Sequence, residues 1–167
     1  MQDANASPLS VADLITRLER SRRSLMDAIA GLDEEGFRSR PRSGEWTAAA
    51  VLSHLLATER VILERAQSAL TQVGYHVTSQ TEEERQEGAR LAQRVPVPQI
   101  VHGLLAQRRD TLRLLERLSP DELARRFNHQ RRGEQSVGGL FQHIAEHEEE
   151  HAEQISALRA RAAARQA

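Results

Sequence analysis

QSVGGLFQHIAEHEEEHAEQISAL, residues 135–158, is the stretch that decides the fold of this chain. Its apolar positions recur at alternating spacings of three and four residues, which is the pattern of a bundle helix with one buried face. This buried face consists of Val137, Leu140, Ile144, His147, His151, Gln154 and Leu158. Two histidines therefore occupy positions where a hydrophobic core favours leucine.

These two histidines lie one helical turn apart, and both are predicted to point inward. Because successive residues of a helix turn by about 100°, His151 falls within the apolar arc, His147 at its edge and His143 beyond it. Burial of an imidazole ring costs free energy unless the ring has a polar partner. A metal ion would supply that partner, and a hydrogen bond within the core is the simpler alternative. The helix alone leaves both open.

The composition is that of an ordinary globular domain. The chain has 167 residues, a formal net charge of -1 and no cysteine. We expect one all-α domain over residues 1–167, with flexible tails at residues 1–6 and about 160–167. The N-terminus has neither a basic start nor an apolar run, so no signal peptide is predicted. Without cysteine, neither a thiolate ligand nor a cysteine nucleophile can come from the chain.

Charge gives no reason to expect nucleic acid or an anionic membrane as a partner. Arg131 and Arg132 are interpreted as part of a solvated surface, and no stretch has the apolar length of a membrane span. We therefore expect a cytoplasmic protein with a small-molecule substrate, and with neither nucleic acid nor membrane as a partner.

Three further amphipathic segments precede the last helix. The first covers residues 11–32, after a predicted N-cap at Ser7. The second follows Thr47 and continues through residue 70, and the third covers about residues 98–118. Each has a face of leucine, isoleucine and valine at helical spacing. Four such segments predict a four-helix bundle.

The connections between these helices differ in length. Residues 71–98 are polar, without a sustained period, and form an unusually long crossover between the second and third helices. Residues 119–122, SPDE, form a capping box that opens a short helix to about Phe127. The segment that follows is interpreted as a turn, and Ser136 caps the last helix. No alternating run predicts a β-strand.

The string HEEEH, residues 147–151, matches the HExxH motif of zinc peptidases. Its context does not fit that class, because those enzymes need a third ligand downstream and, after Glu153, the chain offers nothing suitable. A ligand from a facing helix fits better. His54, at the margin of the second helix, would complete a site of three histidines with His147 and His151, leaving positions for water or substrate. Three imidazoles suit zinc, nickel, iron or copper.

Two other residues are candidates for supporting roles. Glu148 projects into the apolar arc beside His147, where it could act as a base, as an occasional ligand or as a hydrogen-bond partner of a ligand. A buried salt bridge to an arginine is the equal alternative. His143 is a second choice as a ligand because of its outward orientation. No residue of the sequence is identified as catalytic.

Two motifs carry a family resemblance. Gly44-Glu45-Trp46-Thr47 followed by VLSHL resembles the GEW(T/S)xxxVLxHL signature of the DinB-like/YfiT-like superfamily. The stretch GEQSVGGLFQHIAEHEEEHAEQI, residues 133–155, resembles the C-terminal half of that family, including its HxxxHxxQI pattern. One departure is Ala50, where members often have a glutamate that completes a capping box. The resemblance covers most of the chain.

The resemblance implies a four-helix bundle of distinctive topology, often a homodimer. It also implies a divalent metal held by His54, His147 and His151, with His143 as a second choice. Characterised members include transferases and isomerases that use low-molecular-weight thiols such as mycothiol, bacillithiol or glutathione. A metal can promote deprotonation of such a thiol, and the thiolate is the nucleophile. A chain without cysteine is consistent with a thiol supplied from outside.

Two classes of function therefore stand side by side. The first is a metal-dependent enzyme, by resemblance a thiol transferase, or a metal-dependent hydrolase at the same site. The second is a metal-binding or stress-associated structural or interaction protein without catalysis. An open metal position lined by a pocket would favour the enzyme, and a closed, fully protein-ligated metal would favour the second class.

Overall fold

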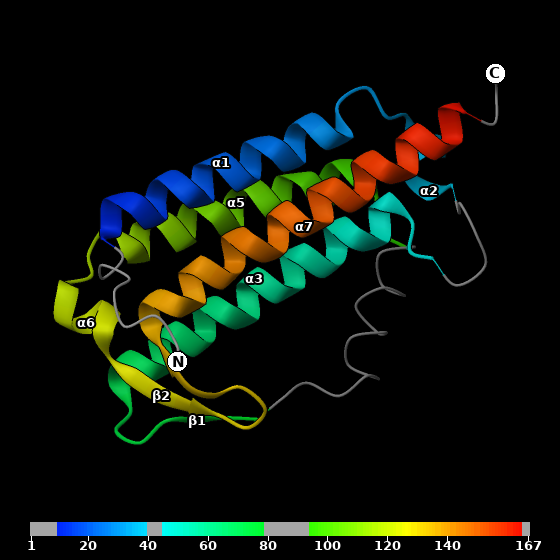
Figure 1. The fold of residues 1–167 in the computed structure, drawn as a ribbon. Coiled ribbons are helices and arrows are strands. Elements are labelled where there is room, and N and C mark those ends of the chain that lie inside the picture. Colours follow the sequence, from blue (N-terminus) through cyan, green and yellow to red (C-terminus); the bar gives the residue numbers. More distant parts are fainter. Residues whose placement is uncertain (1–9, 40–44, 79–93, 165–167) are drawn as a thin grey trace, which may run out of the picture.

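The computed structural model describes residues 10–39, 45–78 and 94–164. Four long helices lie side by side as a bundle (Figure 1): α1 (Val11–Ile29), α3 (Ala48–Thr71), α5 (Val97–Leu115) and α7 (Val137–Ala163). Two short helices, α2 (Glu34–Arg38) and α6 (Pro120–Ala124), lie at opposite ends of the bundle. The predicted four-helix bundle is confirmed. Among the described residues, no helix is both long and apolar enough to cross a membrane.

The topology explains the long crossover. α1 packs on α5 and α7, and α3 also packs on α5 and α7. Figure 1 shows α3 and α5 running in the same direction, opposite to α1 and α7. Because α3 has 24 residues, the chain must return along about 36 Å, at about 1.5 Å per residue, before α5 can begin. Much of the connection, residues 79–93, lies outside the described residues.

Three predicted helix starts are confirmed. The Thr47 hydroxyl accepts a hydrogen bond from the backbone N–H of Ala50 at the start of α3. Ser119 forms a capping box at the start of α6, and the Ser136 hydroxyl accepts the N–H of Gly139 in α7. Such side-chain oxygens satisfy backbone donors that have no partner within the helix.

The bounds of the first helix were predicted incorrectly. α1 begins after Ser10 rather than after Ser7, because Asp13 stands three residues beyond Ser10 and completes a capping box with it. The helix ends at Ile29 rather than near residue 32. Gly31 follows with a positive φ of 76°, a conformation that glycine adopts without strain.

A small three-stranded sheet at one end of the bundle was not predicted (Figure 1). It contains β1 (His76–Val77), β2 (Arg126–His129) and β3 (Gly133–Ser136). β2 and β3 form an antiparallel hairpin, and β1 pairs parallel to β2. The predicted short helix therefore ends at Ala124, before Phe127, and the predicted turn is a hairpin. These strands are too short to show a clear alternation, although Phe127 is buried in the core.

The core is divided into two apolar clusters with a polar layer between them. One cluster lies toward the hairpin and includes Phe141, and the other lies toward α2 and includes Leu52. The buried polar residues are Ser21, Arg22, Glu59, Arg108, Thr111 and Glu148. Each long helix contributes one charged residue to this layer, so the layer fixes the helices relative to one another.

Candidate metal centre

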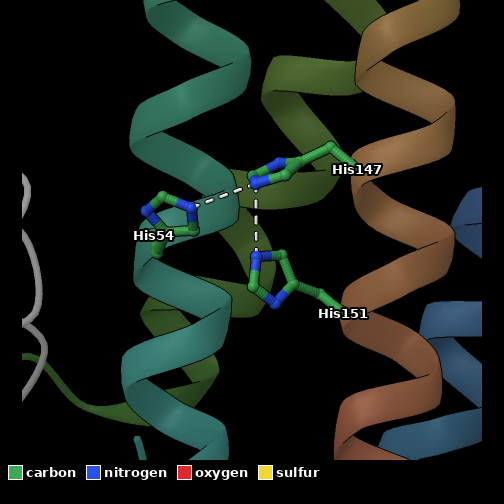
Figure 2. Close-up of side chains that lie close together, drawn as sticks. All are labelled: His54, His147 and His151. Carbon is green, nitrogen blue, oxygen red and sulfur yellow. Dashed lines mark hydrogen bonds between the residues drawn. The ribbon is translucent and has the colours of Figure 1, made fainter. Parts of the chain in front are cut away.

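Three histidines converge between α3 and α7. Figure 2 shows the rings of His54, from α3, and of His147 and His151, from α7, turned toward one another. The Nε2 atom of His147 lies 3.2 Å from Nε2 of His54 and 3.2 Å from Nε2 of His151. One nitrogen from each ring lies within 4.8 Å of the other two. The sequence prediction that these three side chains meet is therefore correct.

The spacing of these nitrogens fits a bound metal ion. Two imidazole nitrogens that share a tetrahedral zinc at 2.0–2.1 Å lie about 3.3 Å apart. Among the described residues, His54, His147 and His151 are the group of histidine and acidic side chains that meets the geometry of a metal site. Three neutral nitrogen donors also suit nickel and iron, so the ligand set admits several divalent metals.

Gln154 orients one of the three rings. Its Oε1 lies 2.7 Å from Nδ1 of His151. Because a carboxamide oxygen only accepts, Nδ1 of His151 carries the proton and Nε2 of the neutral ring keeps its lone pair. That lone pair is directed at the point where the three rings meet. Such a contact to the outer nitrogen is typical of metal-binding histidines. The sequence pattern placed Gln154 on the buried face without indicating this role.

His147 is held in its neutral form. Burial, followed by the neighbouring rings of His151 and His54, lowers the pKa of His147 from 6.5 to about 3. At neutral pH the ring is therefore uncharged, and one of its two nitrogens has a free lone pair. A metal ligand must be unprotonated, so His147 binds a metal without first losing a proton.

Trp46 forms a wall of the cluster. Its ring meets that of His54 edge to face, with 4.9 Å between centroids, and lies nearly parallel to His151 at 6.5 Å. The neighbouring residue Thr47 caps α3, which fixes Trp46 directly before the first turn. Trp46 and Thr47 of the GEWT motif thus position an aromatic ring against two candidate ligands.

Glu148 does not face the three histidines. Its Oε1 accepts from Nε of Arg22 at 2.6 Å, and its Oε2 accepts from Arg108 at 2.9 Å and from Ser21 at 2.6 Å. Of the two alternatives, the structure shows the buried salt bridge. Glu148, the first glutamate of the HEEEH string, is thus engaged by arginines, which removes the general base that a peptidase mechanism requires.

The same charged layer binds α3 through Glu59, five residues after His54. Glu59 accepts hydrogen bonds from Arg22, Arg108 and Thr111, with the Arg22 Nη2 to Oε2 distance at 2.8 Å. Two arginines and two glutamates form a neutral network in which both carboxylates are fully engaged. Burial of charge is tolerated when it is paired in this way. The network fixes the register of α3 and α7, which carry the three histidines.

A cavity of ≈ 260 Å³ opens beside the cluster, and His54 and His147 lie in its wall. His143 also lines this cavity, with its ring centroid 5.6 Å from that of His147, and it does not join the three converging nitrogens. Burial lowers the pKa of His143. A larger cavity, of ≈ 340 Å³, lies between α2 and the end of α7, and no histidine lines it. The histidine chemistry therefore belongs to the smaller cavity.

Arginines complete the wall of the smaller cavity, and their role was missed from the sequence. Arg65 comes from α3, and Arg131 and Arg132 come from the turn between β2 and β3. Arg131 and Arg132 are exposed, as predicted, and both also line this cavity, which the sequence did not indicate. Only the fold of the hairpin brings them next to α3.

The comparisons with known proteins agree with this architecture. A sequence profile of the DinB superfamily matches residues 17–155. The chain belongs to the DinB superfamily. The resemblance carried by GEWT and HxxxHxxQI is therefore confirmed. No curated protein matches the chain in sequence.

Solved structures share the DinB fold. YfiT from Bacillus subtilis, described as a probable metal-dependent hydrolase with an unusual four-helix bundle topology, matches with a TM-score of 0.74 and 18% identity, over 96% of this chain and 93% of YfiT. The colibactin self-resistance protein ClbS, solved with double-stranded DNA, matches with a TM-score of 0.72 and 16% identity, over 93% and 98%. The four-helix bundle protein TT2238 matches with a TM-score of 0.50 and 23% identity, over 89% and 99%.

Proposed function

We propose that this DinB protein is a divalent-metal-dependent enzyme that transfers a low-molecular-weight thiol to a small electrophilic substrate. His54, His147 and His151 would hold the metal, which we expect to be zinc, nickel or iron. One observation carries the proposal: three ring nitrogens converge at the wall of a cavity, within 4.8 Å of one another. Three protein ligands leave a coordination position for a substrate, and the cavity gives access to it.

The chain's own residues prepare this site. Gln154 fixes the tautomer of His151, and Trp46 packs against His54 and His151. The paired charges around Glu148 fix the position of α7 along the bundle axis. The bound metal would supply the lowered pKa of a thiol. Because the chain has no cysteine, the thiol must come from a cosubstrate such as mycothiol, bacillithiol or glutathione. The cavity then orients the electrophile beside it.

A metal-dependent hydrolase is the second candidate. The structural likeness to YfiT, described as a probable metal-dependent hydrolase, favours it. Both candidates use the same three histidines and differ in whether a thiol or water attacks the substrate. The non-catalytic alternative requires a metal closed off by protein ligands, and the cavity beside His54 and His147 argues against it.

The test is product analysis with tag-free, metal-loaded protein and a panel of electrophiles, with and without each thiol. A transferase forms the thiol adduct only when the thiol is present, and His147→Ala abolishes the product. A hydrolysis product that forms equally with and without thiol would instead identify the protein as a hydrolase. We also propose a homodimer, which light scattering of the same sample tests directly.

A further inference from the structure

We propose that the cavity beside the three histidines is an oxyanion-binding subsite, which selects small substrates that carry a carboxylate or phosphate group. The proposal deepens the proposed function and rests on it for the view that the ligand is a substrate. The subsite itself is built from arginines that take no part in the histidine cluster. These arginines are Arg65, Arg131 and Arg132.

The wall of this cavity is positively charged. Three arginines line it, and among the described residues no aspartate or glutamate does. This local excess is not a property of the whole chain, which has a formal net charge of -1. A concave site lined by one sign of charge concentrates ligands of the opposite sign.

The positive charges of the three arginines act on the same part of the cavity. Burial lowers the pKa of His129, and the charges of Arg65, Arg132 and Arg131 lower it further. The His129 Nδ1 accepts the backbone N–H groups of Arg131 and Arg132, at 3.2 and 3.4 Å. These two bonds hold the turn that carries both arginines, and they leave the neutral ring with its proton on Nε2.

Unlike their neighbours, the cavity arginines have no acidic partner among the residues that the structure describes. Within the described parts of the chain, Arg65 contacts the carbonyl oxygen of Thr78 at 3.5 Å, and none of the three forms an ion pair with a carboxylate. By contrast, Arg126 on the same hairpin pairs with Glu134 at 3.0 Å. A guanidinium group without a carboxylate partner is suited to bind an external carboxylate or phosphate.

The cavity links this charge to the candidate metal centre. Its wall runs from Arg131 and Arg132 in the hairpin, past Arg65, to His54 and His147. A molecule held by its anionic group at the arginines would therefore direct its remaining atoms toward the histidines. The volume of ≈ 260 Å³ is near the lower end of small-molecule sites, which span about 300–1,000 Å³. That size favours a small anion over a nucleic-acid duplex.

The experiment is calorimetric titration of zinc-loaded protein with succinate, inorganic phosphate and the uncharged analogue succinamide. Arg132→Gln and Arg65→Gln are compared with wild type and with Arg126→Gln and Arg60→Gln, which remove exposed arginines from the same hairpin and the same helix. We expect each cavity variant to weaken anion binding about tenfold or more, as for loss of a hydrogen bond to a charged group. Both control variants should bind as wild type does.

The two anions separate the possible sources of the oxyanion. Tighter binding of succinate identifies a carboxylate substrate, and tighter binding of phosphate identifies a phosphate ester; either supports the subsite. Binding that is unchanged in Arg132→Gln and Arg65→Gln, or succinamide that binds as well as succinate, would overturn it. A short DNA duplex that binds more tightly than both anions through the same arginines would overturn the small-molecule assignment.

Metal content, measured on the same samples, separates this inference from the proposed function. If the Arg132→Gln variant retains its zinc but no longer binds the anion, the subsite is distinct from the metal ligands. Wild-type protein that takes up no zinc, yet binds succinate through Arg132, would remove the metal-dependent function and leave the subsite standing. Zinc-loaded protein that binds neither anion would remove the subsite alone.

Discussion

Replacement of Glu148 by glutamine tests the assignment of this residue to the buried charge network. The side chain is 2% exposed and accepts hydrogen bonds from Arg22, Arg108 and Ser21. Glutamine keeps the shape but removes the negative charge, so two buried guanidinium groups would share the single charge of Glu59. Removal of one partner from a buried ion pair typically costs about 3–5 kcal/mol. We expect a loss of that size in the free energy of unfolding.

The assay is urea unfolding followed by far-UV circular dichroism, on protein with and without zinc. For a chain of this size, a loss of about 3–5 kcal/mol corresponds to a melting temperature lower by roughly 6–20 °C. The matched control is Glu149→Gln at the adjacent position, where the carboxylate pairs with exposed Arg20. Such a surface pair contributes about 0–1 kcal/mol.

The two roles of Glu148 predict different results. If it belongs to the network, folded Glu148→Gln protein is less stable and still binds zinc in the wild-type ratio. Equal stability of Glu148→Gln and Glu149→Gln, together with loss of zinc, would refute the network assignment and make Glu148 a ligand.

Two further outcomes are expected. Gln154→Leu removes the hydrogen bond that fixes the tautomer of His151. The affinity for zinc, measured by competition with a chromophoric chelator, should therefore fall about 10–100-fold. Unchanged affinity would show that Gln154 does not orient a ligand. For metal-free protein, the pKa of His147 is lowered by burial to about 3, from 6.5, so the unfolded chain takes up a proton that the folded chain does not. The free energy of unfolding should therefore fall as the pH drops from about 6.5 toward 3. Urea titrations in the presence of chelator should show a smaller fall for His147→Gln, and an identical fall in both proteins would contradict the assigned pKa.

Local patterns in the sequence were sufficient to predict the bundle and the inward direction of His147 and His151, whereas the meeting of His54 with them was predicted from the geometry of bundle sites and from the family resemblance. The spacing of His147 and His151 on an apolar face fixes their direction on α7, and the Thr47 cap fixes the phase of the helix that carries His54. Each of these two features depends on the sequence of one helix alone. The long crossover was also predicted, because residues 71–98 are polar and have no sustained helical period. A connection of that length is unusual between neighbouring helices.

What could not be predicted depends on contacts between distant segments. Glu148 joins Arg22 and Arg108 only when α1, α5 and α7 reach a particular register, and helical periodicity contains no information about that register. Likewise, the hairpin places Arg131 and Arg132 next to α3, although its four-residue strands are too short for a periodic pattern to emerge. The charge of the cavity is therefore a property of the fold.

The most direct test of the central claim is elemental analysis by mass spectrometry of tag-free protein purified without chelator. We predict close to one divalent transition metal per chain in the wild type and loss of most of it in His147→Ala, with helix content nearly unchanged. Wild-type protein that is folded, contains no metal and takes up neither zinc nor nickel would contradict the claim. So would a His147→Ala variant that retains its metal in full.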